Sequence, residues 1–142
     1  MTAFDGSFHH KIDAKGRLSL PADYRRSLKQ DLKLVLSPEK DYPSLWVFDA
    51  DEFTNWLDHY FDKRGGYDPS NQKMSRWRKV MASRAAKCQM DDSGRIRLTA
   101  EQREKAGLSG DVMIIGDFDH LEIWDTDRWN AFEEEFMSLD WD

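Results

Sequence analysis

Two short turns carry the residues with the clearest potential for chemistry. The first reads Asp13-Ala14-Lys15-Gly16-Arg17, and the second reads Asp91-Asp92-Ser93-Gly94-Arg95. An aspartate that opens a turn accepts backbone N–H bonds, and a glycine reaches the positive φ that tight turns need. We therefore predict structural roles for Asp13, Asp91 and Gly94. The basic residues suit an anionic partner, because arginine binds guanine with two donors and lysine binds phosphate as a point charge.

The two turns differ in charge, and the first is the more cationic. Lys15 stands where the second turn has Ser93, and the second turn carries an additional acid, Asp92. Two histidines and a lysine also precede the first turn. We predict an anion contact from the first turn, and the candidate contact residues of the two turns and their surroundings are Lys15, Gly16, Arg17, His10 and Arg95. In the alternative interpretation, each Asp–Arg pair only stabilises its own hairpin.

Other patterns argue against an enzyme or a metal site. His9 and His10 are adjacent, so on a strand their side chains face opposite sides and do not jointly hold one ion. Cys88 is the only cysteine, which excludes an intrachain disulfide and a cysteine-based metal site. The chain shows no glycine-rich phosphate loop and no nucleophile motif. We therefore expect no catalytic residue, metal, cofactor or small-molecule substrate.

The turns belong to a longer internal repeat. Pro21 to Arg25 aligns with Thr99 to Arg103, and Leu45 to Asp51 aligns with Leu121 to Asp127. Each copy reads as strand, turn, strand, short helix, strand, strand and longer helix. Because one copy is too small to bury a comfortable core, we expect the two copies to share one.

The hydrophobic spacing and the capping residues predict the elements of each copy. The first copy is expected to hold strands over 7–12, 17–20, 33–36 and 45–48 and helices over 22–28 and 52–61. The second is expected to hold strands over 87–90, 96–98, 112–115 and 121–124, a helix capped by Thr99 with Gln102, and a last helix capped by Asp127. Asp51 is the predicted cap of helix 52–61.

The segment between the copies predicts a linker over 64–69 and a connecting helix over 72–86. These boundaries divide the chain into a first repeat (5–51), connecting helices and linker (52–86), and a second repeat with a C-terminal helix (87–142). The tail over 139–142 is expected to fray.

The composition of the chain limits the cellular compartments and the classes of binding partner that we expect for it. The 142-residue chain has a formal net charge of −6, which does not favour nucleic acid, but a local basic patch sets the field at a contact. No acidic residue lies between Pro69 and Met90. No run approaches the ~20 apolar residues of a membrane span, and the first residues lack the features of a signal peptide. We expect a cytoplasmic protein with no membrane contact.

The turns and their surroundings resemble the MraZ family of bacterial regulators. The family's first signature, D-x-K-G-R followed by an alternating strand and a proline, matches residues 8–21. Its second signature, C-Q-M-D-x-x-G-R, matches residues 88–95. Phe4 with Gly6, Gly107-Leu108 and Trp124-Asp125 also fit the family. Thr99 stands where members often have proline, and threonine can cap the helix there.

The resemblance implies an α+β fold with two tandem AbrB-like hairpin and helix repeats, interlocked into a β-rich swapped-hairpin barrel with flanking helices. It implies a homo-oligomeric ring, octameric or dodecameric, that regulates transcription from the division and cell-wall gene cluster. The ring would bind double-stranded DNA of the nucleoid at spaced G-rich promoter repeats, with Lys15 and Arg17 in the DNA-contacting loop. The alternative, motivated by the net negative charge and the aromatic helices, is an oligomeric ring scaffold that binds protein partners.

Overall fold

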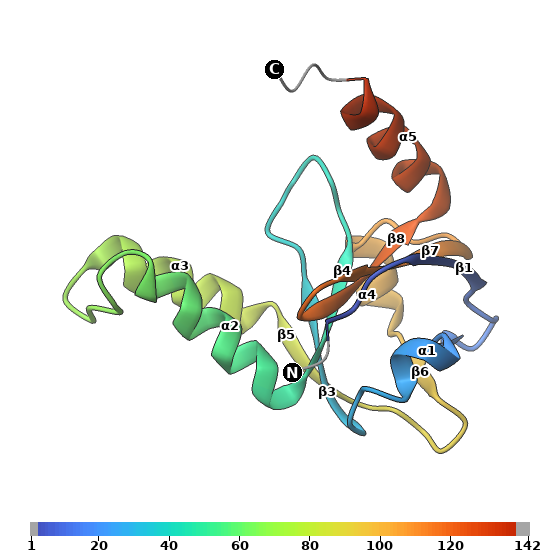
Figure 1. The fold of residues 1–142 in the computed structure, drawn as a ribbon, viewed down its shortest axis with the longest axis horizontal. Helices are drawn as coiled ribbons and strands as arrows, with labels where there is room; N and C mark the ends of the chain where they lie inside the picture. The colour runs from blue at the N-terminus through green and yellow to red at the C-terminus, as the bar shows by residue number, and fades with distance from the viewer. Residues whose placement is uncertain (1–2, 139–142) are drawn as a thin grey trace.

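The computed structural model describes residues 3–138, so the predicted fraying of 139–142 lies outside the described residues. The chain is a mixed α+β protein, as expected. It contains a six-stranded antiparallel sheet, a separate two-stranded ribbon and peripheral helices (Figure 1). No helix in this described range combines the length and the apolar run that crossing a bilayer would need.

Both repeats contain the predicted order of elements. The first holds β1 (Ser7–Lys11), β2 (Arg17–Ser19), α1 (Ala22–Arg25), β3 (Asp31–Leu36), β4 (Leu45–Asp49) and α2 (Ala50–Asp62). The connecting helix is α3 (Gln72–Ser83). The second repeat holds β5 (Ala85–Gln89), β6 (Arg95–Arg97), α4 (Ala100–Lys105), β7 (Asp111–Asp117), β8 (His120–Asp125) and α5 (Thr126–Met137).

The two repeats exchange strands. The strand order of the large sheet is β1-β7-β8-β4-β3-β5, so the first strand of each repeat pairs with a strand of the other repeat. The ribbon is formed in the same way, from β2 of the first repeat and β6 of the second. Swapping the repeats only reverses the strand order, which gives the fold an approximate twofold axis. The predicted interlocking is therefore confirmed.

One core joins the ribbon to the sheet. Leu18 and Ile96 face each other across the ribbon and are almost completely buried. They belong to the same apolar cluster as Leu34, Val47 and Ile114 of the large sheet. Because the cluster contains residues of both repeats, its apolar side chains would become exposed to water if either repeat stood alone.

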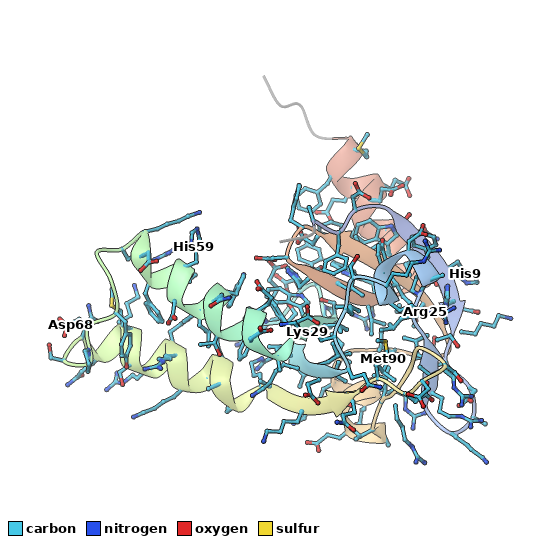
Figure 2. The ribbon with its side chains drawn as sticks, turned by 60° about the horizontal axis from the view of Figure 1, so that its bottom comes forward. His9, Arg25, Lys29, His59, Asp68 and Met90 are labelled. Carbon is cyan, nitrogen blue, oxygen red and sulfur yellow. The ribbon has the colours of Figure 1, made fainter. Side chains whose placement is uncertain are left out.

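Helices α2 and α3 form a hairpin that extends away from the sheet (Figure 1). Its interior is aromatic: the Trp77 ring stacks on Tyr60 with 3.9 Å between centroids, and Trp56 packs against Trp77 at 6.0 Å. Trp56 and Tyr60 thus lie on the face of α2 that meets α3. Figure 2 places Asp68 at the outer end of this hairpin, well away from Arg25.

Several predicted element ends were wrong. β4 and β8 run directly into their helices, so Asp49 and Asp125 hold the N-cap positions in place of Asp51 and Asp127. Asp51 instead pairs with Lys29 at 2.8 Å.

The connecting helix also ends earlier than predicted, at Ser83, because Ala85 and Ala86 pair with β3 as part of β5. Helix α1 ends at Arg25 and not at Leu28, whereas the predicted capping box at Thr99 and Gln102 is present.

Candidate nucleic-acid interface

The first turn is built around the carboxylate of Asp13. Its Oδ1 accepts the backbone N–H groups of Lys15 and Arg17, each at 2.9 Å. Its Oδ2 accepts the Nε–H of Arg17 at 2.7 Å. Among residues 3–138, the two terminal nitrogens of Arg17 make no hydrogen bond. The turn therefore holds the guanidinium by one edge and leaves its outer end for a partner.

The hydrogen bonds to Asp13 also fix its charge. The backbone N–H of Arg17, followed by its side chain, lowers the pKa of Asp13 to about 2. Asp13 is therefore ionised at neutral pH and retains its hydrogen bonds to Arg17 there.

The second turn repeats this geometry. Asp91 Oδ1 accepts the backbone N–H groups of Ser93 and Arg95 at 2.9 Å, and its Oδ2 accepts Arg95 Nε–H at 3.1 Å. The backbone N–H of Arg95 is the largest of the causes that lower the pKa of Asp91. The Asp–Arg staple is thus a shared feature of both copies, and it orients an arginine in each.

The two turns are tied to each other through the ribbon. Gly16 and Gly94 have φ values of 81° and 79°, a conformation that favours glycine. The Gly16 carbonyl accepts the N–H of Leu98 at 2.8 Å, and the Gly94 carbonyl accepts the N–H of Leu20 at 2.9 Å. Each turn is therefore positioned by the strand of the other repeat.

Each turn also receives an arginine from the short helix of the other repeat. The Arg25 Nη1 donates to the Ser93 carbonyl at 2.9 Å, beside Gly94. The guanidinium of Arg103 lies beside Gly16 in the equivalent place. Figure 2 shows Arg25 on the lobe that holds the sheet. Sequence reasoning missed both residues as site candidates, although Arg25 and Arg103 are aligned in the internal repeat.

The ribbon adds a further arginine. Arg17 lies opposite Arg97, and Arg95 lies opposite Ser19, while the alternate positions point into the core. All four of these residues therefore share the outer face. The cations gathered on the ribbon and its turns are Lys15, Arg17, Arg25, Arg95, Arg97 and Arg103.

His10 is the predicted contact residue that lies outside the two turns. It lies on β1 and shares its half-buried face with Phe8, which packs against the core. His9 and Lys11 point the other way, where both approach Asp111, at 3.6 and 3.8 Å. The structure thus brings Lys15, Gly16 and Arg17 together and leaves His10 on the strand that leads to them.

Comparisons with known proteins show which family the chain belongs to. The profile of the MraZ protein family matches residues 3–64 and 81–141, which include both turns and both short-helix arginines. The transcriptional regulator MraZ of Corynebacterium urealyticum is 35% identical over 129 residues, covering 91% of this chain and 85% of the relative.

Two further relatives carry the same name. That of Symbiobacterium thermophilum is 35% identical over 134 residues, covering 94% of this chain and 92% of the relative. That of Yersinia pestis is 29% identical over 128 residues, covering 89% and 82%. With two tandem AbrB-like repeats interlocked and both signature turns in place, this chain belongs to the MraZ family.

Proposed function

We propose that this protein is a sequence-specific DNA-binding regulator of transcription that reads G-rich promoter repeats. The observation that carries the proposal is the arginine held at each turn by its own aspartate, above all Arg17 with exposed Lys15 beside it. The relatives' name, that of a transcriptional regulator and not of an enzyme, supports the same function.

The geometry suits guanine. An arginine reads guanine through two parallel hydrogen bonds to O6 and N7 in the major groove. Because Asp13 already holds the Nε edge of Arg17, little side-chain freedom is lost when the terminal nitrogens bind a base. The groove, about 12 Å wide, also admits a two-stranded ribbon such as β2–β6. Lys15 and Arg103 then supply charge for the flanking phosphates.

A single site of this kind would bind DNA weakly, so repetition is part of the proposal. We place the protein in a homo-oligomeric ring, octameric or dodecameric, whose turns engage spaced repeats upstream of the division and cell-wall gene cluster in the nucleoid. Several turns on one rigid ring act at high effective concentration if their spacing matches the repeats. Helix α5 has the surface for self-association, because Trp129, Phe132 and Phe136 are only half-buried and Met137 is 78% exposed.

The test is binding of Arg17→Ala to the DNA upstream of the protein's own gene, measured by fluorescence anisotropy. One bidentate guanine contact is worth about 1–3 kcal/mol, or about 5- to 150-fold in affinity per turn. When several turns bind the same DNA, the losses of affinity at the individual turns multiply. Arg64→Ala is the matched control, because Arg64 lies over the Tyr60 ring in the helical hairpin and not at the turns. Unchanged affinity of Arg17→Ala would refute the proposal.

Lys15→Ala tests the phosphate contact separately. Removing one phosphate contact per bound turn reduces the slope of log K against log salt by about 0.9 for each turn engaged. Light scattering on both variants should give the wild-type mass, since neither residue lies in the core.

The scaffold alternative draws on α5, whose half-buried aromatic face and acidic residues would suit a protein partner. The same salt titration separates the two functions. A scaffold retains no promoter DNA in preference to unrelated DNA at any salt concentration.

A further inference from the structure

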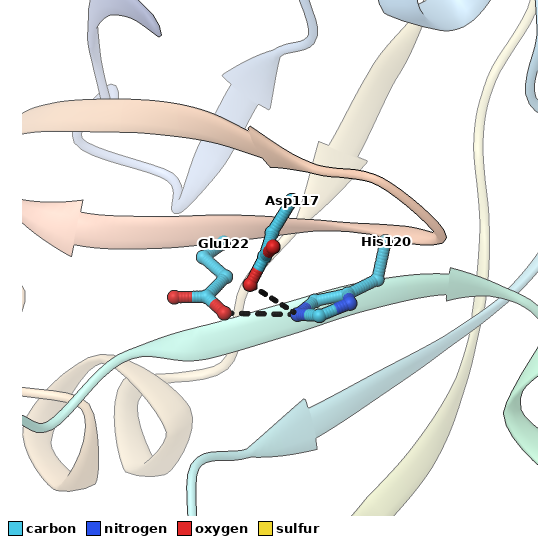
Figure 3. A group of neighbouring side chains, drawn as sticks. All are labelled: Asp117, His120 and Glu122. Atoms are coloured by element: carbon cyan, nitrogen blue, oxygen red, sulfur yellow. Dashed lines mark hydrogen bonds and ion pairs between the residues drawn. The ribbon is translucent and has the colours of Figure 1, made fainter. Parts of the chain in front are cut away.

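A cluster of ionisable side chains lies on the β7–β8 hairpin, outside the nucleic-acid interface. Asp117 is the cross-strand partner of His120, and Glu122 follows on the same face of β8, two residues along. Figure 3 shows the two carboxylates approaching the same nitrogen of the imidazole ring. His120 Nε2 lies 2.9 Å from Glu122 Oε2 and 3.8 Å from Asp117 Oδ2.

The distances fit a small metal ion. The three ligand atoms lie within 4.8 Å of one another. Zinc binds nitrogen and oxygen ligands at about 2.0–2.2 Å, so tetrahedral ligands stand about 3.3 Å apart. The observed 2.9 and 3.8 Å fall on either side of that value, and a shift of about half an ångström in each carboxylate would reach it.

The surroundings orient the ligands as a metal site requires. His120 Nδ1 lies 2.7 Å from Asp119 Oδ1, a carboxylate that fixes the ring and directs Nε2 towards the other two acids. Trp124 Nε1–H donates to the second oxygen of Glu122 at 2.9 Å, which fixes that carboxylate as well. The ring itself is held by stacking on Phe48 at 4.8 Å between centroids.

The charges are unbalanced without a cation. Asp117, Asp119 and Glu122 surround one imidazole, which carries at most a single positive charge. The side chains of His120 and Glu122 are only 6% and 13% exposed, whereas those of Asp117 and Asp119 are 50% and 35% exposed, so the excess negative charge lies on the side of the cluster that a cation could approach.

The fold itself does not need the cluster. In the first repeat the positions aligned with His120 and Glu122 are Ser44 and Trp46, and the β3–β4 hairpin forms with these two uncharged residues. The cluster is therefore a property of the second repeat alone.

We propose that Asp117, His120 and Glu122 bind a first-row divalent metal ion, with Zn²⁺ the best match to one imidazole and two carboxylates. Magnesium and calcium are disfavoured, because both prefer all-oxygen sites. A cavity of about 330 Å³ lined by Asp117 and Glu122 provides the approach, and Glu39 lines the same cavity as a source of a fourth ligand in place of water. The prediction of a metal-free protein from sequence considered His9, His10 and Cys88, and it did not consider His120.

The test is calorimetric titration of the chelator-treated full chain with Zn²⁺, free of DNA. We expect one ion per chain, and a tetrahedral Co²⁺ spectrum when Co²⁺ replaces Zn²⁺. Asp117→Asn is the main variant, because its side chain is half exposed and should tolerate the change. It should weaken binding by at least tenfold, and Asp119→Asn should weaken it by about 10- to 100-fold through the orientation of the ring.

His9→Gln is the matched control, since His9 also lies near a carboxylate, at 3.6 Å from Asp111, but on the surface. It should bind Zn²⁺ as wild type does. Circular dichroism of each variant checks that the fold is retained. The proposal is overturned by the absence of saturable Zn²⁺ binding, by wild-type binding in folded Asp117→Asn, by loss of the ion in His9→Gln, or by equally tight binding of Mg²⁺.

Discussion

Replacing the glycine of each turn by alanine should destabilise the two copies unequally. Gly16 and Gly94 have nearly the same φ, so the cost of placing a Cβ in the left-handed region, about 1–2 kcal/mol, is shared. The surroundings differ. A Cβ at Gly16 would collide with the backbone carbonyl of Leu98, which is held in the ribbon. A Cβ at Gly94 would meet the side chain of Arg25, which can move away.

The difference can be given a magnitude. Overpacking against atoms that cannot move costs about 1–3 kcal/mol, so Gly16→Ala should lower the free energy of unfolding by about 2–5 kcal/mol in all. Gly94→Ala should cost little more than the left-handed penalty and the lost Arg25–Ser93 hydrogen bond, together about 2–3 kcal/mol.

The assay is urea unfolding of both variants at one protein concentration, because self-association would otherwise shift the midpoints. Gly65→Ala is the control: its φ is 86°, and a Cβ there would meet nothing within 4 Å. It should show the conformational penalty alone. If Gly16→Ala proves no less stable than Gly94→Ala, the inference that the first turn packs rigidly against the ribbon is wrong.

Three further predictions concern acid stability, capping and the helical hairpin. Because the pKa of Asp13 is lowered to about 2 by folding, its stabilising contribution is present above its ordinary pKa of 3.8 and is lost as pH falls towards 2. Asp13→Asn should therefore show a smaller fall in melting temperature over that range than wild type. Thr99→Ala should cost about 1 kcal/mol, measured by urea unfolding, since the Thr99 hydroxyl no longer accepts the N–H of Gln102. Trp77→Ala should reduce the helical circular dichroism signal, because it removes the ring that stacks on Tyr60; an unaltered spectrum would show that the hairpin stands without this stack.

Much of the fold was accessible from the sequence because the repeat is visible in it. The repeat predicted the element order, the small size of each copy predicted a shared core, and the structure shows both. The ends of elements were less predictable. Asp49 and Asp51 are both good caps by residue type, and only the length of β4 decides between them.

The interface was predictable in part for a similar reason. Only Gly16 separates Lys15 from Arg17 in the chain, so local sequence brings them together. Arg25 and Arg103 reach the turns only because the repeats exchange strands, and no local pattern reports such a contact. The acids around His120 were missed because their meeting depends on the register of one hairpin.

Strand exchange also has a consequence for synthesis of the protein. β1 leaves the ribosome before its partner β7, which follows only after roughly a hundred residues, or about 5–20 s at usual rates of translation. β3 and β2 likewise lack their neighbours from the second repeat until β5 and β6 have been made. The nascent first repeat therefore exposes unpaired strand edges, and the second repeat of another nascent chain could pair with them. Ribosomes spaced closely on one message would bring such copies together, so slower initiation should favour correct intrachain pairing.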